Sequence, residues 1–176
     1  MSDDRRTSVR RRAELPFAWR NSVAGATTVE LCRTLGIPVA LALQSRLADL
    51  DEHFQSAAGS VTDSRVAEAL RALDGKLEVL EEALLAQAPV PPPAPLDLSA
   101  DGLAFEAPEA LAEGSWIAVH VVLPTAYHLV GLAQVSHCAA PHGDATGYRI
   151  GAGFHGLEDP VARRLTRFAI SRDQVP

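Results

Sequence analysis

The sequence has few cysteines, few aromatic residues and no long apolar run. Of its 176 residues, 5% are aromatic and two are cysteine, Cys32 and Cys138. Two cysteines so far apart, without ligand spacing, indicate neither a disulfide scaffold nor a zinc ribbon. No apolar stretch approaches the roughly 18 residues of a membrane-spanning helix, and the charged N-terminus lacks the apolar segment of a signal peptide. We therefore expect a cytoplasmic protein without membrane insertion.

Common catalytic motifs are also missing. The sequence has no Gly-rich phosphate loop, no Gly-x-Ser-x-Gly elbow and no His-Glu-x-x-His. His137, Cys138 and His142 offer three zinc donors close together, but they fall at a predicted hairpin rim beside Pro141. Zinc sites usually need four well-spaced ligands, or three and an open position. We expect no enzyme, no metal site and no cofactor, and we interpret His120 and His128 as ordinary strand residues.

The charge is negative overall and positive at one end. A hydrophobic fraction of 47% excludes global disorder, and a net charge of −6 argues against binding bulk nucleic acid. Residues 1–20 nevertheless contain six arginines against three acidic residues. Such a segment is either an anion-binding arm or a solvated, disordered tail.

Helical periodicity occupies the first half of the chain. The pattern predicts a short helix over 28–35 that ends at Gly36, then a second helix with its apolar stripe at Leu43, Leu47, Leu50 and Phe54. From residue 62 to 87, apolar residues alternate spacings of four and three, which is the heptad pattern of a coiled coil. The expected oligomerisation seam consists of Val66, Leu70, Leu73, Leu77, Leu80 and Leu84. The alternative is that this stripe packs only on the preceding helix.

Strand-like alternation flanks these helices. It appears at 12–20, with Pro16 placing that strand at an edge or bulge, and returns at 96–98, 103–106, 116–123, 129–137 and 148–155. A final helix is predicted with Asp159 as its N-cap. The sequence thus predicts an α+β fold with four parts. An arginine-rich arm and first strand occupy 1–20, inserted helices 22–88, a Pro-rich spacer 89–95, and the rest of an antiparallel sheet or small barrel 96–176.

Two short motifs carry a more specific indication. Arg6-Thr-Ser-Val-Arg10 has the form RxxxR, and Asp97-Leu-Ser-Ala-Asp-Gly102 has the form DxSxxG. Followed by Tyr148-Arg-Ile-Gly-Ala-Gly-Phe154 and a closing helix, they resemble a PilZ domain over about 100 residues, roughly 4–20 and 95–172. The resemblance implies a six- or seven-stranded β-barrel that binds the bacterial messenger cyclic di-GMP. The inserted heptad helices resemble the atypical, tetrameric branch of that family.

The resemblance also implies a binding site. Its expected residues are Arg5, Arg6, Arg10, Asp97, Ser99 and Gly102. Arginine pairs bidentately with phosphate oxygens or with guanine O6 and N7, and a carboxylate accepts from guanine N1–H and N2–H. The alternative is structural: Asp97 and Ser99 cap a turn, and backbone geometry alone requires Gly102.

Two functions follow as expectations. The first is a non-enzymatic cyclic di-GMP receptor that acts on an unknown downstream protein as a coiled-coil homo-oligomer, with the tetramer implied by the resemblance alone. The second is a ligand-independent adaptor in motility or pilus regulation, built on a degenerate barrel. A small hydrolase is a third reading, which the missing catalytic residues do not support.

Overall fold

A computed structural model describes residues 9–42, 54, 57–58, 60–85, 89–124, 127–141 and 147–171. The strands are β1 (Arg11–Ser22), β2 (Pro93–Leu98), β3 (Gly102–Ala107), β4 (Trp116–Leu123), β5 (Tyr127–Ala139) and β6 (Tyr148–His155). The helices are α1 (Thr28–Leu35), α2 (Val39–Ala42), α4 (Ser64–Leu85) and α5 (Asp159–Ile170).

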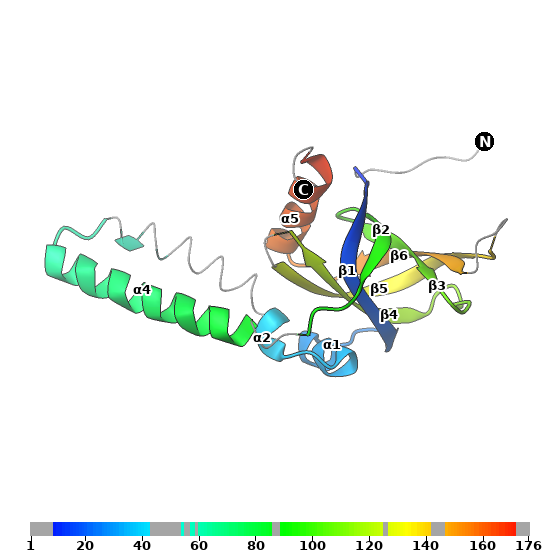
Figure 1. Cartoon of the computed structure of the whole chain (residues 1–176), viewed down its shortest axis with the longest axis horizontal. Helices are drawn as coiled ribbons and strands as arrows, with labels where there is room; N and C mark the ends of the chain where they lie inside the picture. The colour runs from blue at the N-terminus through cyan, green and yellow to red at the C-terminus, as the bar shows by residue number, and fades with distance from the viewer. Residues whose placement is uncertain are drawn as a thin grey trace.

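The strands form a closed antiparallel barrel in the order β1-β2-β3-β6-β5-β4 (Figure 1). Alternate side chains of each strand point inward, as strand geometry requires. The interior is filled by leucine, isoleucine and valine around Phe105, which is 1% exposed and packs against Phe17 and Trp19. The predicted antiparallel barrel with a C-terminal helix is confirmed.

Strand β1 pairs with two partners, and Pro16 marks the change. Residues from Arg11 to Pro16 pair with β2, whereas those from Phe17 to Ser22 pair with β4. Proline has no N–H to donate, so it is tolerated where one ladder gives way to the next. The predicted strand over 12–20 is thus correct in place and too short at both ends.

The Pro-rich segment is only partly a spacer. Strand β2 begins at Pro93, and its first residues pair with β1 through Ala94 opposite Leu15 and Pro95 opposite Glu14. Strand β2 therefore includes the last three residues of the predicted 89–95 spacer. The sequence predicted this strand only from residue 96, because the prolines before it hide the alternation of apolar and polar residues. Proline fits the extended backbone of a strand as well as it fits a polyproline segment.

Helices α1 and α2 cover the outer face of β4 and β5. Helix α1 has a capping box between Thr27 and Glu30 and ends at Gly36 with φ of 69°, as predicted. Leu31 packs on Ala118 and Leu132 of the barrel. Burial raises the pKa of the Cys32 thiol, which lies in a second small cluster with Ile37 and Leu41.

Helix α4 extends away from the barrel (Figure 1). It begins after Asp63, whose carboxylate accepts from the backbone N–H groups of Arg65 and Val66. Its apolar stripe is largely open to solvent: Leu73, Leu77 and Leu80 are 53%, 57% and 60% exposed. Val66 is also exposed and Leu70 is half-buried, whereas the side chain of Leu84 lies outside the described residues. The predicted second helix, with Pro38 in its first turn, begins as α2; of its apolar stripe Phe54 is described, whereas Leu43, Leu47 and Leu50 lie outside the described residues.

Helix α5 closes the barrel with Val161 and Leu165 in the core. Its N-cap is Glu158, which makes no side-chain capping bond, and Asp159 is already the first helical residue. The predicted N-cap at Asp159 is therefore wrong by one position. Proline at the second position fits the first turn equally well, because the N–H groups there have no helical partner.

Candidate ligand-binding site

The start of β1 lies beside the end of β2, which brings the two sequence motifs together. Arg11 is opposite Leu98 and Arg12 is opposite Asp97 in the antiparallel ladder. Arg10 directly precedes the strand and is exposed. Arg5 and Arg6 lie outside the described residues. The fold therefore places the second arginine of RxxxR next to the DxSxxG segment.

Asp97 points to the outside of the barrel and is bound by an arginine. Its neighbours Leu96 and Leu98 are buried in the interior, so the alternation of the strand turns Asp97 outward. The Asp97 carboxylate forms an ion pair with the guanidinium of Arg149 on β6. Their side chains are 30% and 34% exposed, so solvent and a ligand have access to both groups.

Arg149 reaches Asp97 across β3. Along the ladders, Asp97 is opposite Ala104 and Ala104 is opposite Gly151. Arg149 itself is opposite Glu106, so its guanidinium reaches Asp97 diagonally, past the small side chain of Ala104. Sequence reasoning missed this pair, because Arg149 and Asp97 are 52 positions apart and are brought together only by the pairing of β2 and β6 with β3.

Ser99 and Gly102 form a tight turn between β2 and β3. The Ser99 hydroxyl and backbone N–H both donate to the Gly102 carbonyl, at 3.1 and 2.9 Å, and Ser99 is 1% exposed. A Cβ at Gly102 would lie 2.3 Å from the carbonyl oxygen of Ala152. Both residues thus have a structural role, whether or not they also touch a ligand.

Arg11 ties the root of the arginine arm to the C-terminus of α5. Its guanidinium donates to the carbonyls of Phe168 and Ser171, at 3.0 and 2.7 Å, and lies 4.7 Å from the centre of the Phe168 ring. A cation is favoured at a helix C-terminus, where carbonyl groups lack helical partners. Arg11 therefore has a structural role, whereas Arg10 and Arg12 are exposed at the surface.

A second polar pair is buried on another part of the barrel. The rings of His120 (β4) and His128 (β5) stack, and the nitrogens Nε2 of His120 and Nδ1 of His128 are 2.9 Å apart. Burial, and then the neighbouring His128, lower the pKa of His120 to about 4. Burial also lowers the pKa of His128. The prediction of ordinary strand histidines did not anticipate this pairing.

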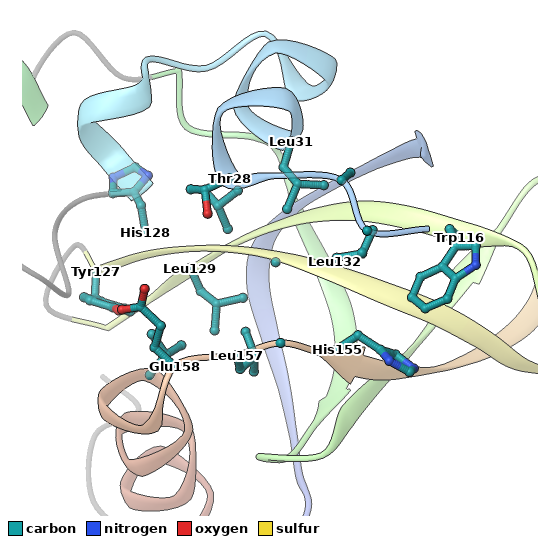
Figure 2. Close-up of a pocket in the computed structure, with 16 residues that line it drawn as sticks. Thr28, Leu31, Trp116, Tyr127, His128, Leu129, Leu132, His155, Leu157 and Glu158 are labelled. Carbon is teal, nitrogen blue, oxygen red and sulfur yellow. The ribbon is translucent and has the colours of Figure 1, made fainter. Parts of the chain in front are cut away.

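A hollow among the described residues lies between α1, β5 and the start of α5 (Figure 2). Its volume is about 370 Å³, and Leu31 and Thr28 border it from α1 while Leu157 and Glu158 border it from the other side. Trp116 packs edge-on against His155 at one end, with ring centres 4.6 Å apart. This hollow is separate from the arginine motif, and none of the predicted site residues lines it.

Two other features of the described residues bear on the sequence expectations. No helix among them has both the length and the apolar character needed to span a bilayer. Within the same residues, no three histidine, cysteine or acidic side chains gather at a spacing suited to a metal ion. His142, one of the three considered zinc donors, lies outside the residues that the structure describes.

Comparison with known proteins supports the fold. No family model and no curated protein matches the chain. Among solved structures it is similar to a pathogenic protein from Xanthomonas campestris, described as a new tetrameric PilZ domain self-assembled via an unusual helical bundle. The two are 14% identical with a TM-score of 0.57, over 93% of this chain and 87% of the other. At this identity the likeness concerns the fold, and this chain has the PilZ fold.

Proposed function

We propose that the protein is a non-enzymatic receptor for cyclic di-GMP. The observation that supports the proposal is the register of β1 and β2 on a PilZ-type barrel, in which Arg11 is opposite Leu98 and Arg12 opposite Asp97, so that Arg10, the last residue of RxxxR, directly precedes this ladder. The messenger has two phosphates and two guanines, so it requires cationic forks together with acceptors for base edges. Exposed arginines and an outward carboxylate supply both chemistries within one surface.

In this proposal, Arg6 and Arg10 bind phosphate and guanine while Asp97 accepts from a guanine edge. Arg5 adds to the positive charge of the segment. Ser99 and Gly102 contribute by holding the β2–β3 turn, since the hydroxyl already bonds to the Gly102 carbonyl. Several charge-assisted contacts are needed, because each residue of an arm that becomes ordered costs about 1 to 2 kcal/mol.

We also propose that the chain self-associates through α4. Its apolar stripe is more than half exposed at Leu73, Leu77 and Leu80, and an exposed heptad seam is stabilised when a second helix covers it. The similar protein from Xanthomonas campestris is a tetramer assembled via a helical bundle. A tetramer of this chain, relaying ligand binding to a downstream protein in the cytoplasm, is the corresponding proposal.

Isothermal titration of the full chain with cyclic di-GMP tests the receptor. We expect saturable binding, and we expect Arg10→Ala and Asp97→Ala each to weaken it at least about tenfold, the value of one charge-assisted hydrogen bond. Arg163→Ala is the matched control, because Arg163 is an exposed arginine on α5 that belongs to neither motif. Absence of binding by the unmodified chain at tens of micromolar ligand, on the order of 10⁻⁵ M, would refute the proposal.

A ligand-independent adaptor is the second candidate. It is favoured by the structural roles of Ser99 and Gly102, which explain these motif residues without any ligand. Sedimentation with and without cyclic di-GMP, combined with capture of a partner, separates the two candidates. An assembly and a partner interaction that are indifferent to the messenger would support the adaptor.

A further inference from the structure

The carboxylate expected to read guanine already has a partner within the chain. The Arg149 guanidinium pairs with Asp97, and both side chains lie on the outer face of the barrel. Arg149 is the second residue of β6 and lies near the end of the β3–β6 and β5–β6 ladders, opposite Glu106 and Ala139. It therefore presents a cation from a hydrogen-bonded strand to Asp97, which is opposite Arg12 at the start of β1.

We propose that Arg149 is a further ligand-contacting residue of the cyclic di-GMP site. In the free chain it neutralises Asp97, and in the complex a guanine edge replaces it on the carboxylate while its guanidinium moves to a phosphate of the messenger. The inference rests on the proposed receptor function. Neither RxxxR nor DxSxxG includes this residue.

The exchange is reasonable because the two donors have the same shape. A guanidinium offers parallel N–H groups to a carboxylate, and the N1–H and N2–H groups of guanine offer a similar fork. Arg149 therefore occupies the place that the base edge would take on Asp97. The guanidinium can cross β3 because Ala104 and Gly151, which lie near its path from β6 to β2, have little or no side chain.

Charge then directs the displaced arginine to the phosphate. When neutral guanine replaces the guanidinium on Asp97, Arg149 loses the Asp97 carboxylate as its partner next to a ligand that carries two negative charges. Glu106 on β3 is opposite Arg149 in the ladder, and its carboxylate repels the same phosphates. Pairing of Arg149 with a phosphate oxygen restores local neutrality and adds a bidentate contact.

Two other roles of Arg149 predict different effects of its removal on ligand affinity. A simple competitor for Asp97 would weaken binding, so its removal would tighten the complex. A bystander that only braces the barrel would leave affinity and its salt dependence unchanged once folding is intact. Of the three roles, only a phosphate contact predicts that removing the charge of Arg149 both weakens ligand binding and reduces the salt dependence of the affinity.

The test compares Arg149→Gln, Arg149→Lys and the control Arg163→Gln by calorimetric titration with cyclic di-GMP at about 50 and 300 mM salt. We expect Arg149→Gln to bind about tenfold more weakly and to lose part of the salt dependence. Arg149→Lys keeps the charge but not the fork, so it should retain the salt dependence with an intermediate affinity. The control should match the unmodified chain.

The outcomes separate this inference from the receptor proposal. Absence of binding by the unmodified chain refutes the receptor and with it the role of Arg149. Binding by the unmodified chain, with equal or tighter binding by Arg149→Gln, refutes the role of Arg149 alone. Thermal unfolding of each variant confirms that it is folded, and Arg149→Lys decides the question if the glutamine variant does not fold.

Discussion

Acidification should destabilise the barrel through the buried pair of histidines. His120 is 1% exposed and His128 is 5% exposed, and their facing nitrogens are 2.9 Å apart. This contact requires one nitrogen to accept, so the pair cannot hold a proton on both facing atoms. Burial first, and the charge of His128 second, lower the pKa of His120 to about 4. In the unfolded chain the same group has its ordinary pKa of 6.5.

The sign follows from proton uptake. Between pH 6.5 and about 4 the unfolded chain binds a proton at His120 that the folded chain does not. The free energy of unfolding is therefore largest above this window and falls as the pH drops through it. At pH 5 the loss is about 2 kcal/mol, and its limit below pH 4 is about 3 kcal/mol, from 1.36 kcal/mol per pKa unit. The lowered pKa of His128 acts in the same direction.

Urea unfolding at pH 7.5, 6 and 5, followed by tryptophan fluorescence at fixed protein concentration, measures this loss. A drop of about 2 kcal/mol is a large part of the 5 to 15 kcal/mol typical of a domain. The variant His120→Val/His128→Val removes both groups together and leaves no unpaired partner, so its stability should change much less with pH. His137→Gln is the control, because His137 is exposed on β5. Equal pH dependence in the unmodified chain and the double variant would contradict the reasoning.

Three further predictions concern the fold and the assembly. Gly102→Ala should lower the free energy of unfolding by about 1 to 3 kcal/mol in urea titrations, because its Cβ would meet the Ala152 carbonyl at 2.3 Å, whereas Gly153→Ala should cost less, with 3.8 Å to its nearest atom. Arg11→Gln should raise amide exchange in the last turn of α5 about fivefold, through loss of two partly exposed hydrogen bonds, and leave the strands unchanged. Leu77→Asp should dissociate the proposed α4-mediated oligomer in sedimentation velocity, whereas Ala72→Asp, outside the stripe, should not.

Local patterns predicted most of the elements. The strands at 116–123 and 148–155 and the helix at 28–35 have the predicted bounds, because each has a clear period and a clear end, such as the glycine after α1. Strand β1 was harder to delimit, since its length depends on two partners, β2 and β4, that occur much later in the chain. A period in the sequence shows which face of a strand is apolar but not what that strand pairs with.

The candidate site was predictable only in its motif residues. RxxxR and DxSxxG are local, so Arg10 and Asp97 could be named before their neighbours were known. The Asp97–Arg149 pair, the bonds from Arg11 to α5 and the His120–His128 contact all join distant parts of the sequence. Side chains of this kind are brought together by the register of a closed barrel, and single-sequence patterns contain no register.

The order of strands also separates the two sensitive features of this molecule. Asp97 and Arg149 face outward from β2 and β6 across β3, whereas the histidine pair lies on β4 and β5 beneath the side of the barrel that α1 and α2 cover. Protonation of the histidines should therefore loosen the attachment of the inserted helices before it alters the arginine surface. We expect moderate acidification to change self-association more than affinity for cyclic di-GMP. Sedimentation and calorimetry on the same samples at pH 7.5 and 5.5 measure the two properties. Changes in self-association and in ligand affinity that are proportional to one another would contradict this separation.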